Sequence, residues 1–136
     1  MLSPTLDTLR LFAHILAASV WVGGQIVLAG LVPSLRRAFP ESTKVAAQAF
    51  ARVAWPAFAL VVVTGLWNLT EIDVTNTSTA YQVTLFVKIS LAILSGAAAA
   101  VHQLGTSRAA LAIGGALGLL AALGAMFSGY LLSTGT

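Results

Sequence analysis

Four apolar runs dominate this chain, and each is long enough to cross a lipid bilayer. About 20 apolar residues span the roughly 30 Å of hydrocarbon, and the 136-residue sequence is 58% hydrophobic and 8% charged. A soluble domain of this size would lack the polar residues needed to cover its surface. We therefore expect an all-α integral membrane protein, a four-helix bundle that forms a single transmembrane domain over residues 1–136. The expected spans are about residues 5–32, 44–69, 80–104 and 109–132.

The placement of Lys and Arg predicts the orientation of the chain. The connection over residues 71–81 contains neither residue type. Arg36, Arg37, Lys44 and Arg52 lie between the first two apolar runs, and Arg108 lies between the last two. The positive-inside rule therefore places both termini outside, in a multi-pass protein of the cytoplasmic (inner) membrane of a bacterium. Because the cations lie beside membrane spans, the net charge of +3 does not indicate nucleic-acid binding, and the lipid bilayer is the expected partner.

His14 and Lys88 each lie inside an apolar run. Ionisable groups are costly at that depth and usually mark a working site. Counting along the helices puts His14 about 14 Å and Lys88 about 12 Å from the outer ends of their spans. We therefore expect the two side chains to share a protein-lined chamber in the outer half of the membrane. His102 lies near the inner end of its span, about 20 Å away in height, so it cannot join His14 on one haem iron.

The first span carries a polar stripe. Arg10, His14, Trp21 and Gln25 follow helical spacing and share one face, which we expect to point into the bundle. The predicted cofactor-binding residues are His14, Lys88, Arg10 and Trp21. Each also has a structural interpretation, because a buried His or Trp can serve packing alone and Lys88 can extend its ammonium toward the headgroups.

Small residues form a ridge along the fourth span. The ridge consists of Gly114, Gly118, Ala121, Ala125 and Gly129. Such a ridge lets another helix approach closely. Its partner is either another span of this chain or a second copy.

Three stretches of sequence resemble the CopD copper-resistance family of membrane proteins. The run LFAHILAASVWVGG, residues 11–24, resembles the first helix of that family. Two later stretches match as well, residues 50–52 continuing to Thr64-Gly65-Leu66 and residues 79–81 continuing to residues 85–88. The likeness covers about the first three spans. The pattern is also similar to the HemJ type of haem-associated membrane protein, which shares the His-to-Trp-Gly theme.

The CopD resemblance implies copper homeostasis, with copper accepted or moved at the outer half of the cytoplasmic membrane. The expected metal ligands are His14 and Met126, because the chain has no Cys to provide a thiolate. The expected partners are a periplasmic copper donor and a homodimer or larger membrane complex, in which a second copy supplies further spans.

Two alternatives stay open from the residues. The first is a haem b protein for electron transfer or oxidation at the outer face, with His14 on the iron, Trp21 beside the porphyrin, and Lys88 or Arg10 near the propionates. The second is an accessory subunit whose polar stripe docks against a larger complex. No catalytic residue is assigned, and the sequence favours a binding or transport role over an enzyme.

Overall fold

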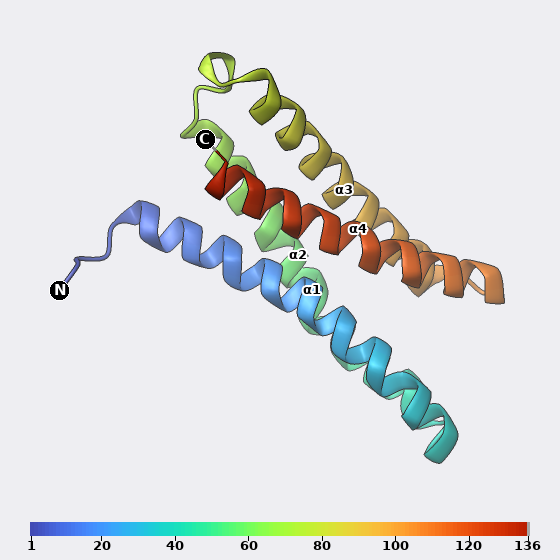
Figure 1. Cartoon of the computed structure of the whole chain (residues 1–136). Coiled ribbons are helices and arrows are strands. Elements are labelled where there is room, and N and C mark those ends of the chain that lie inside the picture. Colours follow the sequence, from blue (N-terminus) through green and yellow to red (C-terminus); the bar gives the residue numbers. More distant parts are fainter. Residues whose placement is uncertain (136) are drawn as a thin grey trace. The chain divides into compact units, whose positions relative to one another are not determined.

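The computed structural model describes residues 1–135, and nearly all of them are helical. Four long helices and one short 3-10 turn follow one another along the chain (Figure 1). They are α1 (Leu6–Ala38), α2 (Ser42–Thr70), η1 (Val74–Asn76), α3 (Thr79–Leu104) and α4 (Arg108–Thr134). No strand occurs within residues 1–135, which confirms the all-α prediction. Each of the four long helices is long and apolar enough to cross a membrane, so the chain is a multi-pass membrane protein.

Polar side chains cap the starts of three helices. At the start of α1, Thr5 and Thr8 form a capping box, in which each hydroxyl accepts the backbone N–H of the other residue. At the starts of α3 and α4, the hydroxyls of Ser78 and Ser107 accept the N–H three residues further on, at 3.2 and 3.0 Å. These bonds satisfy N–H groups that have no partner inside a helix. The caps therefore fix where the spans begin.

The first helix extends beyond its apolar run, through Pro33 to Ala38. Proline removes one backbone hydrogen bond, which a membrane helix tolerates when its neighbours satisfy the freed group. The 33 residues of α1 rise about 50 Å, whereas the hydrocarbon core is about 30 Å thick. At least one end of α1 therefore projects into the headgroup layer.

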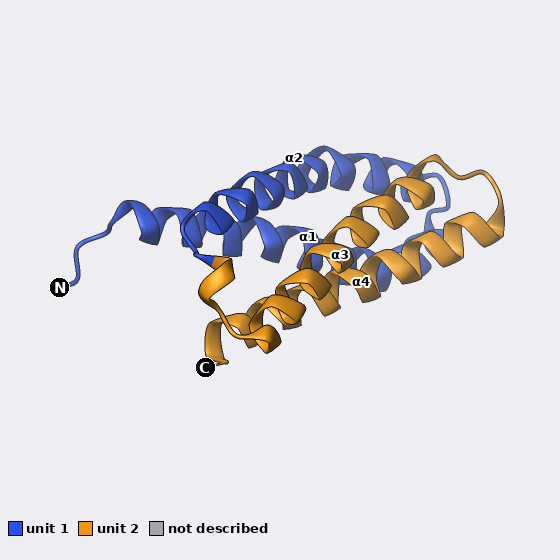
Figure 2. Cartoon of the chain, turned by 90° about the horizontal axis from the view of Figure 1, so that it is seen from above, with its two compact units in different colours: residues 1–73 blue, residues 74–136 orange. Residues whose placement is uncertain are grey.

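The helices pack as two compact hairpins (Figure 2). The first unit, Met1–Asp73, contains α1 and α2, and the second unit begins at Val74 and contains α3 and α4. Within each unit, a short turn joins two helices that lie against each other.

Aromatic rings fill the α1–α2 hairpin. The Trp21 ring centroid lies 4.5 Å from that of Phe58 and 5.4 Å from that of Trp55. Gly24 takes part in the same interface, because a Cβ at this position would overlap the Phe50 ring. The glycine thus accommodates an aromatic side chain from α2.

The small-residue ridge of α4 packs against α3. A Cβ added at Gly114 would lie 2.8 Å from the backbone nitrogen of His102 and 2.9 Å from the carbonyl oxygen of Ala98. Gly118 lies four residues after Gly114, and its carbonyl oxygen accepts a 2.9 Å hydrogen bond from the buried Ser95 hydroxyl. Of the two partners considered for this ridge, α3 of the same chain therefore occupies its Gly114–Gly118 part.

Candidate functional site

His14 is held by a hydroxyl from the neighbouring helix. Its Nδ1 atom lies 2.8 Å from Oγ1 of Thr64, which is buried on α2. The Thr64 hydroxyl in turn donates a 2.6 Å hydrogen bond to the carbonyl oxygen of Leu60. The bond joins the two helices of the first hairpin and fixes the rotation of the imidazole ring.

The direction of these two hydrogen bonds determines the state of the ring. A hydroxyl has one proton, and a carbonyl oxygen can only accept, so the Thr64 proton points to Leu60. The arrangement that satisfies both contacts has Thr64 accepting from His14, which assigns a proton to Nδ1. In the neutral imidazole the lone pair consequently lies on Nε2. A ring that donates through one nitrogen and ligates through the other is the usual arrangement of a metal-binding His.

Gly65 provides a side-chain-free surface for the same ring. A Cβ added there would lie 3.4 Å from Cε1 of His14, so the imidazole rests directly on the α2 backbone. The residues Thr64 and Gly65 therefore act together, one through a hydrogen bond and one through the absence of a side chain.

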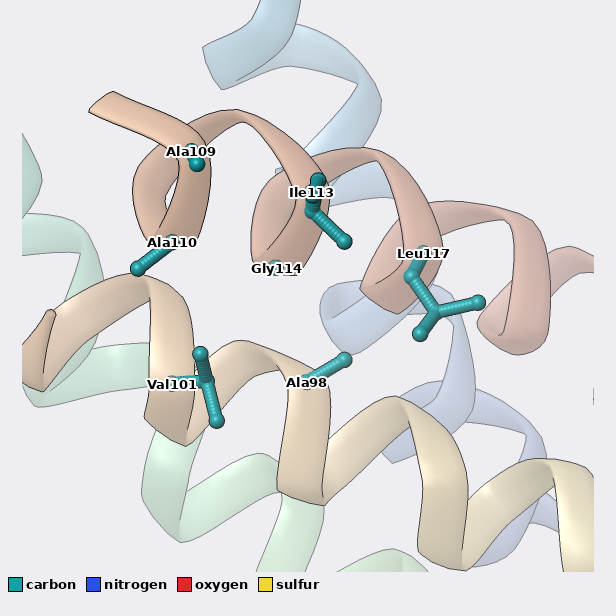
Figure 3. A pocket seen from close by; sticks show the side chains of 7 residues that line it. All are labelled: Ala98, Val101, Ala109, Ala110, Ile113, Gly114 and Leu117. Atoms are coloured by element: carbon teal, nitrogen blue, oxygen red, sulfur yellow. The ribbon is translucent and has the colours of Figure 1, made fainter. Parts of the chain in front are cut away.

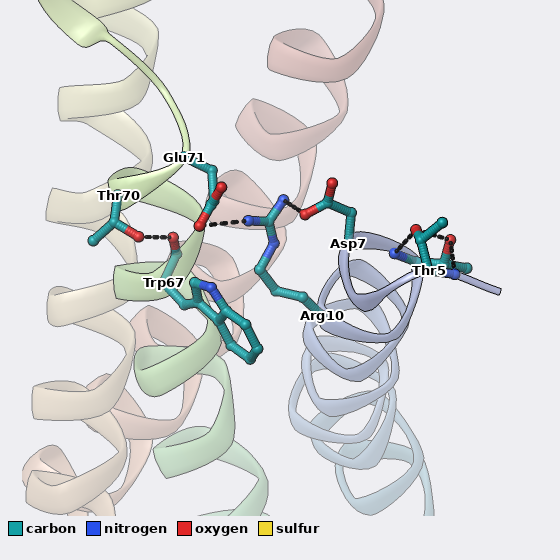
Figure 4. Close-up of polar contacts among 7 residues, drawn as sticks. Thr5, Asp7, Arg10, Trp67, Thr70 and Glu71 are labelled. Atoms are coloured by element: carbon teal, nitrogen blue, oxygen red, sulfur yellow. Dashed lines mark hydrogen bonds and ion pairs between the residues drawn. The ribbon is translucent and has the colours of Figure 1, made fainter.

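Arg10 lies one helical turn from His14 and is 8% exposed. Its Nη2 atom is 3.3 Å from Oδ1 of Asp7, and its Nη1 atom is 3.6 Å from Oε1 of Glu71 at the end of α2. Figure 4 shows the guanidinium between these two carboxylates, with the Trp67 ring beside it. The distance from the guanidinium carbon to the Trp67 ring centroid is 5.9 Å, within the range of a cation–π contact.

The guanidinium still has hydrogen-bonding capacity. Its Nε atom is buried and has no hydrogen-bond partner among residues 1–135, and the same holds for Oδ1 of Asn68. Buried polar atoms are nearly always paired with protein, water or ligand. The Arg10 end of the hairpin can therefore take a further acceptor, such as a water or a carboxylate.

Trp21 has a packing role in the first hairpin. It is 5% exposed and lies in the aromatic cluster with Trp55 and Phe58. The sequence identifies Trp21 by its place on the polar stripe, but helical spacing does not identify Trp55 and Phe58 as its neighbours.

Lys88 and Met126 belong to the second hairpin. The stem and ammonium of Lys88 lie along α4, since a Cβ at Gly129 would be 3.3 Å from both Cε and Nζ. Lys88 is half-buried there. Met126 is 41% exposed.

His102 takes no part in a polar cluster. Its Nδ1 atom donates to the carbonyl oxygen of Leu111, across the turn between α3 and α4. It is exposed, in keeping with a place at the end of the helix.

Ligand-forming side chains do not gather in one place in the described part of the chain, where no three His, Asp or Glu residues lie close enough to hold a metal ion. One pocket of about 200 Å³ lies between α3 and α4 (Figure 3). Glycine and apolar residues line it, including Ala98, Ile113 and Leu117. This pocket suits an alkyl chain rather than a metal. The best-defined candidate for a metal ligand is therefore His14, which lies in the other hairpin.

No protein-family model, curated protein or solved structure matches this chain. The environment of His14 is consequently the starting point for a functional proposal.

Proposed function

We propose that this protein serves copper homeostasis in the cytoplasmic membrane of a bacterium, where His14 accepts copper in the outer half of the bilayer. The observation that carries the proposal is the hydrogen bond from Nδ1 of His14 to Thr64. It directs the lone pair of the neutral ring to Nε2, and imidazole nitrogen is a good ligand for copper. The resemblance of residues 11–24 to the first CopD helix points to the same metal.

Met126 is the second proposed ligand, because a thioether suits Cu(I). His14 lies eight positions after the start of α1, and Met126 lies eight positions before the end of α4. His14 is therefore about 12 Å from the N-terminal end of α1, and Met126 is about 12 Å from the C-terminal end of α4.

Copper binding by the purified protein tests this proposal. The detergent-solubilised chain is loaded with Cu(I), and bound copper is measured by mass spectrometry after gel filtration. We expect about one copper per chain, lost in His14→Ala and weakened in Met126→Leu. His102→Ala is the matched control, because it removes the other imidazole of the chain and should leave the copper content unchanged. Equal copper in His14→Ala and the parent protein would contradict the proposal.

Binding of haem b is the second candidate, and the chemistry of a single imidazole supports it. A porphyrin supplies four nitrogen ligands itself, so one protein nitrogen is sufficient to hold the iron. His14 fits this role, and the open Nε of Arg10 or the ammonium of Lys88 would pair with a propionate. Two of the three Arg10 nitrogens already face Asp7 and Glu71, and Nε and Nη1 have no hydrogen-bond partner among residues 1–135.

The visible spectrum of the same purified sample separates these candidates. A Soret band that disappears in His14→Ala would replace the copper proposal with haem binding. Recovery of a larger complex with neither copper nor haem would instead favour the accessory-subunit role.

A further inference from the structure

Four cations at the turn between α1 and α2 and in the first part of α2 have no carboxylate partner among residues 1–135. We name them the basic tip, which consists of Arg36, Arg37, Lys44 and Arg52. All four are exposed, and none makes an ion pair within residues 1–135. Glu41 is the only acidic residue between positions 11 and 70. The basic tip therefore carries excess positive charge that lacks a counter-ion among residues 1–135.

The length of α1 places the start of the basic tip among lipid headgroups. Arg10 is paired with the exposed carboxylates of Asp7 and Glu71, which marks one membrane surface. Arg36 follows Arg10 by 26 positions, a rise of about 39 Å. The hydrocarbon is about 30 Å thick and the bilayer with headgroups about 40–45 Å. Arg36 and Arg37 would accordingly lie at the depth of the phosphates of the opposite leaflet.

The α2 side of the basic tip reaches from the headgroups toward the hydrocarbon. Lys44 and Arg52 are separated by two helical turns, or about 12 Å, and share one face of α2 with Gln48. A long Arg side chain at the hydrocarbon edge extends its guanidinium to the phosphates. At the turn itself, Phe39 is 60% exposed, and an aromatic ring at this level inserts among lipid headgroups.

We propose that the basic tip binds the phosphate groups of anionic phospholipids. A guanidinium donates two parallel hydrogen bonds to a phosphate, and three of the four cations are arginines. The exposed Phe39 and the depth of the cations favour a lipid over free phosphate. Each cation near an anionic surface is expected to strengthen binding about fivefold.

Lipid titrations of the full-length protein in detergent test this proposal. Phosphatidylglycerol, cardiolipin or phosphatidylcholine is added, and bound lipid is counted by native mass spectrometry. We expect the two anionic lipids to bind and phosphatidylcholine to bind far more weakly. Combining Arg36→Gln, Arg37→Gln and Lys44→Gln should weaken binding of the anionic lipids roughly 100-fold.

Two control variants keep the test independent of folding defects. Arg108→Gln removes one cation from the other short turn, between α3 and α4, and should weaken lipid binding by no more than the roughly fivefold expected for a single cation. Combining Arg36→Lys and Arg37→Lys keeps the charge and should retain most of the binding. Equal binding of phosphatidylcholine, or full binding by the triple Gln variant, would overturn the proposal. Displacement of the lipid by equimolar inorganic phosphate would identify a free-phosphate site instead.

Discussion

At the scale of single residues, the hydroxyl of Thr64 decides which nitrogen of His14 can act as a ligand. Its proton is directed to the carbonyl oxygen of Leu60, so it accepts the Nδ1 proton of the imidazole. Outer hydrogen-bond partners of this kind orient a ligating His and raise its basicity. Thr64 is thus the positioning residue of the proposed copper site.

Substituting Thr64 tests that role. Thr64→Val keeps the shape but removes the hydroxyl, and we expect copper affinity to fall 10–100-fold. The variant should also lose about 1–3 kcal/mol of stability, because Nδ1–H of His14 loses its partner in a part-buried setting. Thr64→Ser retains a hydroxyl and is the matched control, with affinity close to that of the parent. Competition titration against a Cu(I) chelator gives both affinities, and an unchanged value in Thr64→Val would refute the positioning role.

The sequence predicts part of this site for a clear reason. An imidazole and a guanidinium inside an apolar run are conspicuous, so His14 and Arg10 stand out from depth and charge alone. Their partners are harder to identify, because Thr64 and Glu71 lie among several polar residues near the end of the second span. Which of them meets α1 depends on the rotation of α2 about its own axis, and the periodicity of one helix does not specify that rotation.

At the scale of helices, Gly114 lets the backbone of α4 lie directly against the backbone of α3. The atoms that would clash with a side chain there belong to the α3 backbone, so a Cβ would have to push the whole helix away. One turn along, the nearest atom to a Cβ at Gly118 is 3.4 Å away, an ordinary van der Waals contact. The ridge is therefore uneven, and its first glycine is the critical one.

Comparing Gly114→Ala with Gly118→Ala isolates this contact. Both changes gain the same helix propensity of about 1 kcal/mol, so their difference reports packing alone. We expect Gly114→Ala to be less stable than Gly118→Ala by about 1–3 kcal/mol, the usual cost of overpacking. Denaturant titration in detergent followed by circular dichroism measures the difference. Equal stability of the two variants would show that α3 and α4 adjust without strain.

The predicted spans and the observed helices differ in a systematic way. Hydropathy identifies the residues that lie in hydrocarbon, whereas a helix continues until a cap or turn ends it. The apolar run of the first span stops near residue 32, yet α1 continues through Pro33 to Ala38. The predicted and observed starts of α3 and α4 agree to one residue, because the polar connections end at the capping residues Ser78 and Ser107.

At the scale of the whole molecule, an even number of spans puts both chain ends on one side of the membrane. The four helices of the structure meet that condition. The side follows from charge, since the turns at residues 39–41 and 105–107 are flanked by cations and residues 71–78 are not. The positive-inside rule then predicts that the termini lie outside.

Reporter fusions test this orientation in cells. Alkaline phosphatase, which is active only outside the cytoplasm, should be active when fused after Gly135 or after Asn76, and inactive when fused after Pro40. Green fluorescent protein, which folds in the cytoplasm, should give the reverse pattern at the same three positions. Activity of the phosphatase at Pro40 would mean that the chain is inverted and that His14 lies in the cytoplasmic half.

The pairing of Arg10 with Glu71 has a consequence for biogenesis. A guanidinium within a nascent membrane helix costs about 2.5–3.5 kcal/mol at the centre and less toward the ends, and Asp7 offsets only part of this charge because it is 70% exposed. The second carboxylate arrives 61 positions later, after the whole of α2 has been made. We therefore expect α1 and α2 to leave the translocon together. Release of α1 should be delayed until the ribosome has synthesised Glu71.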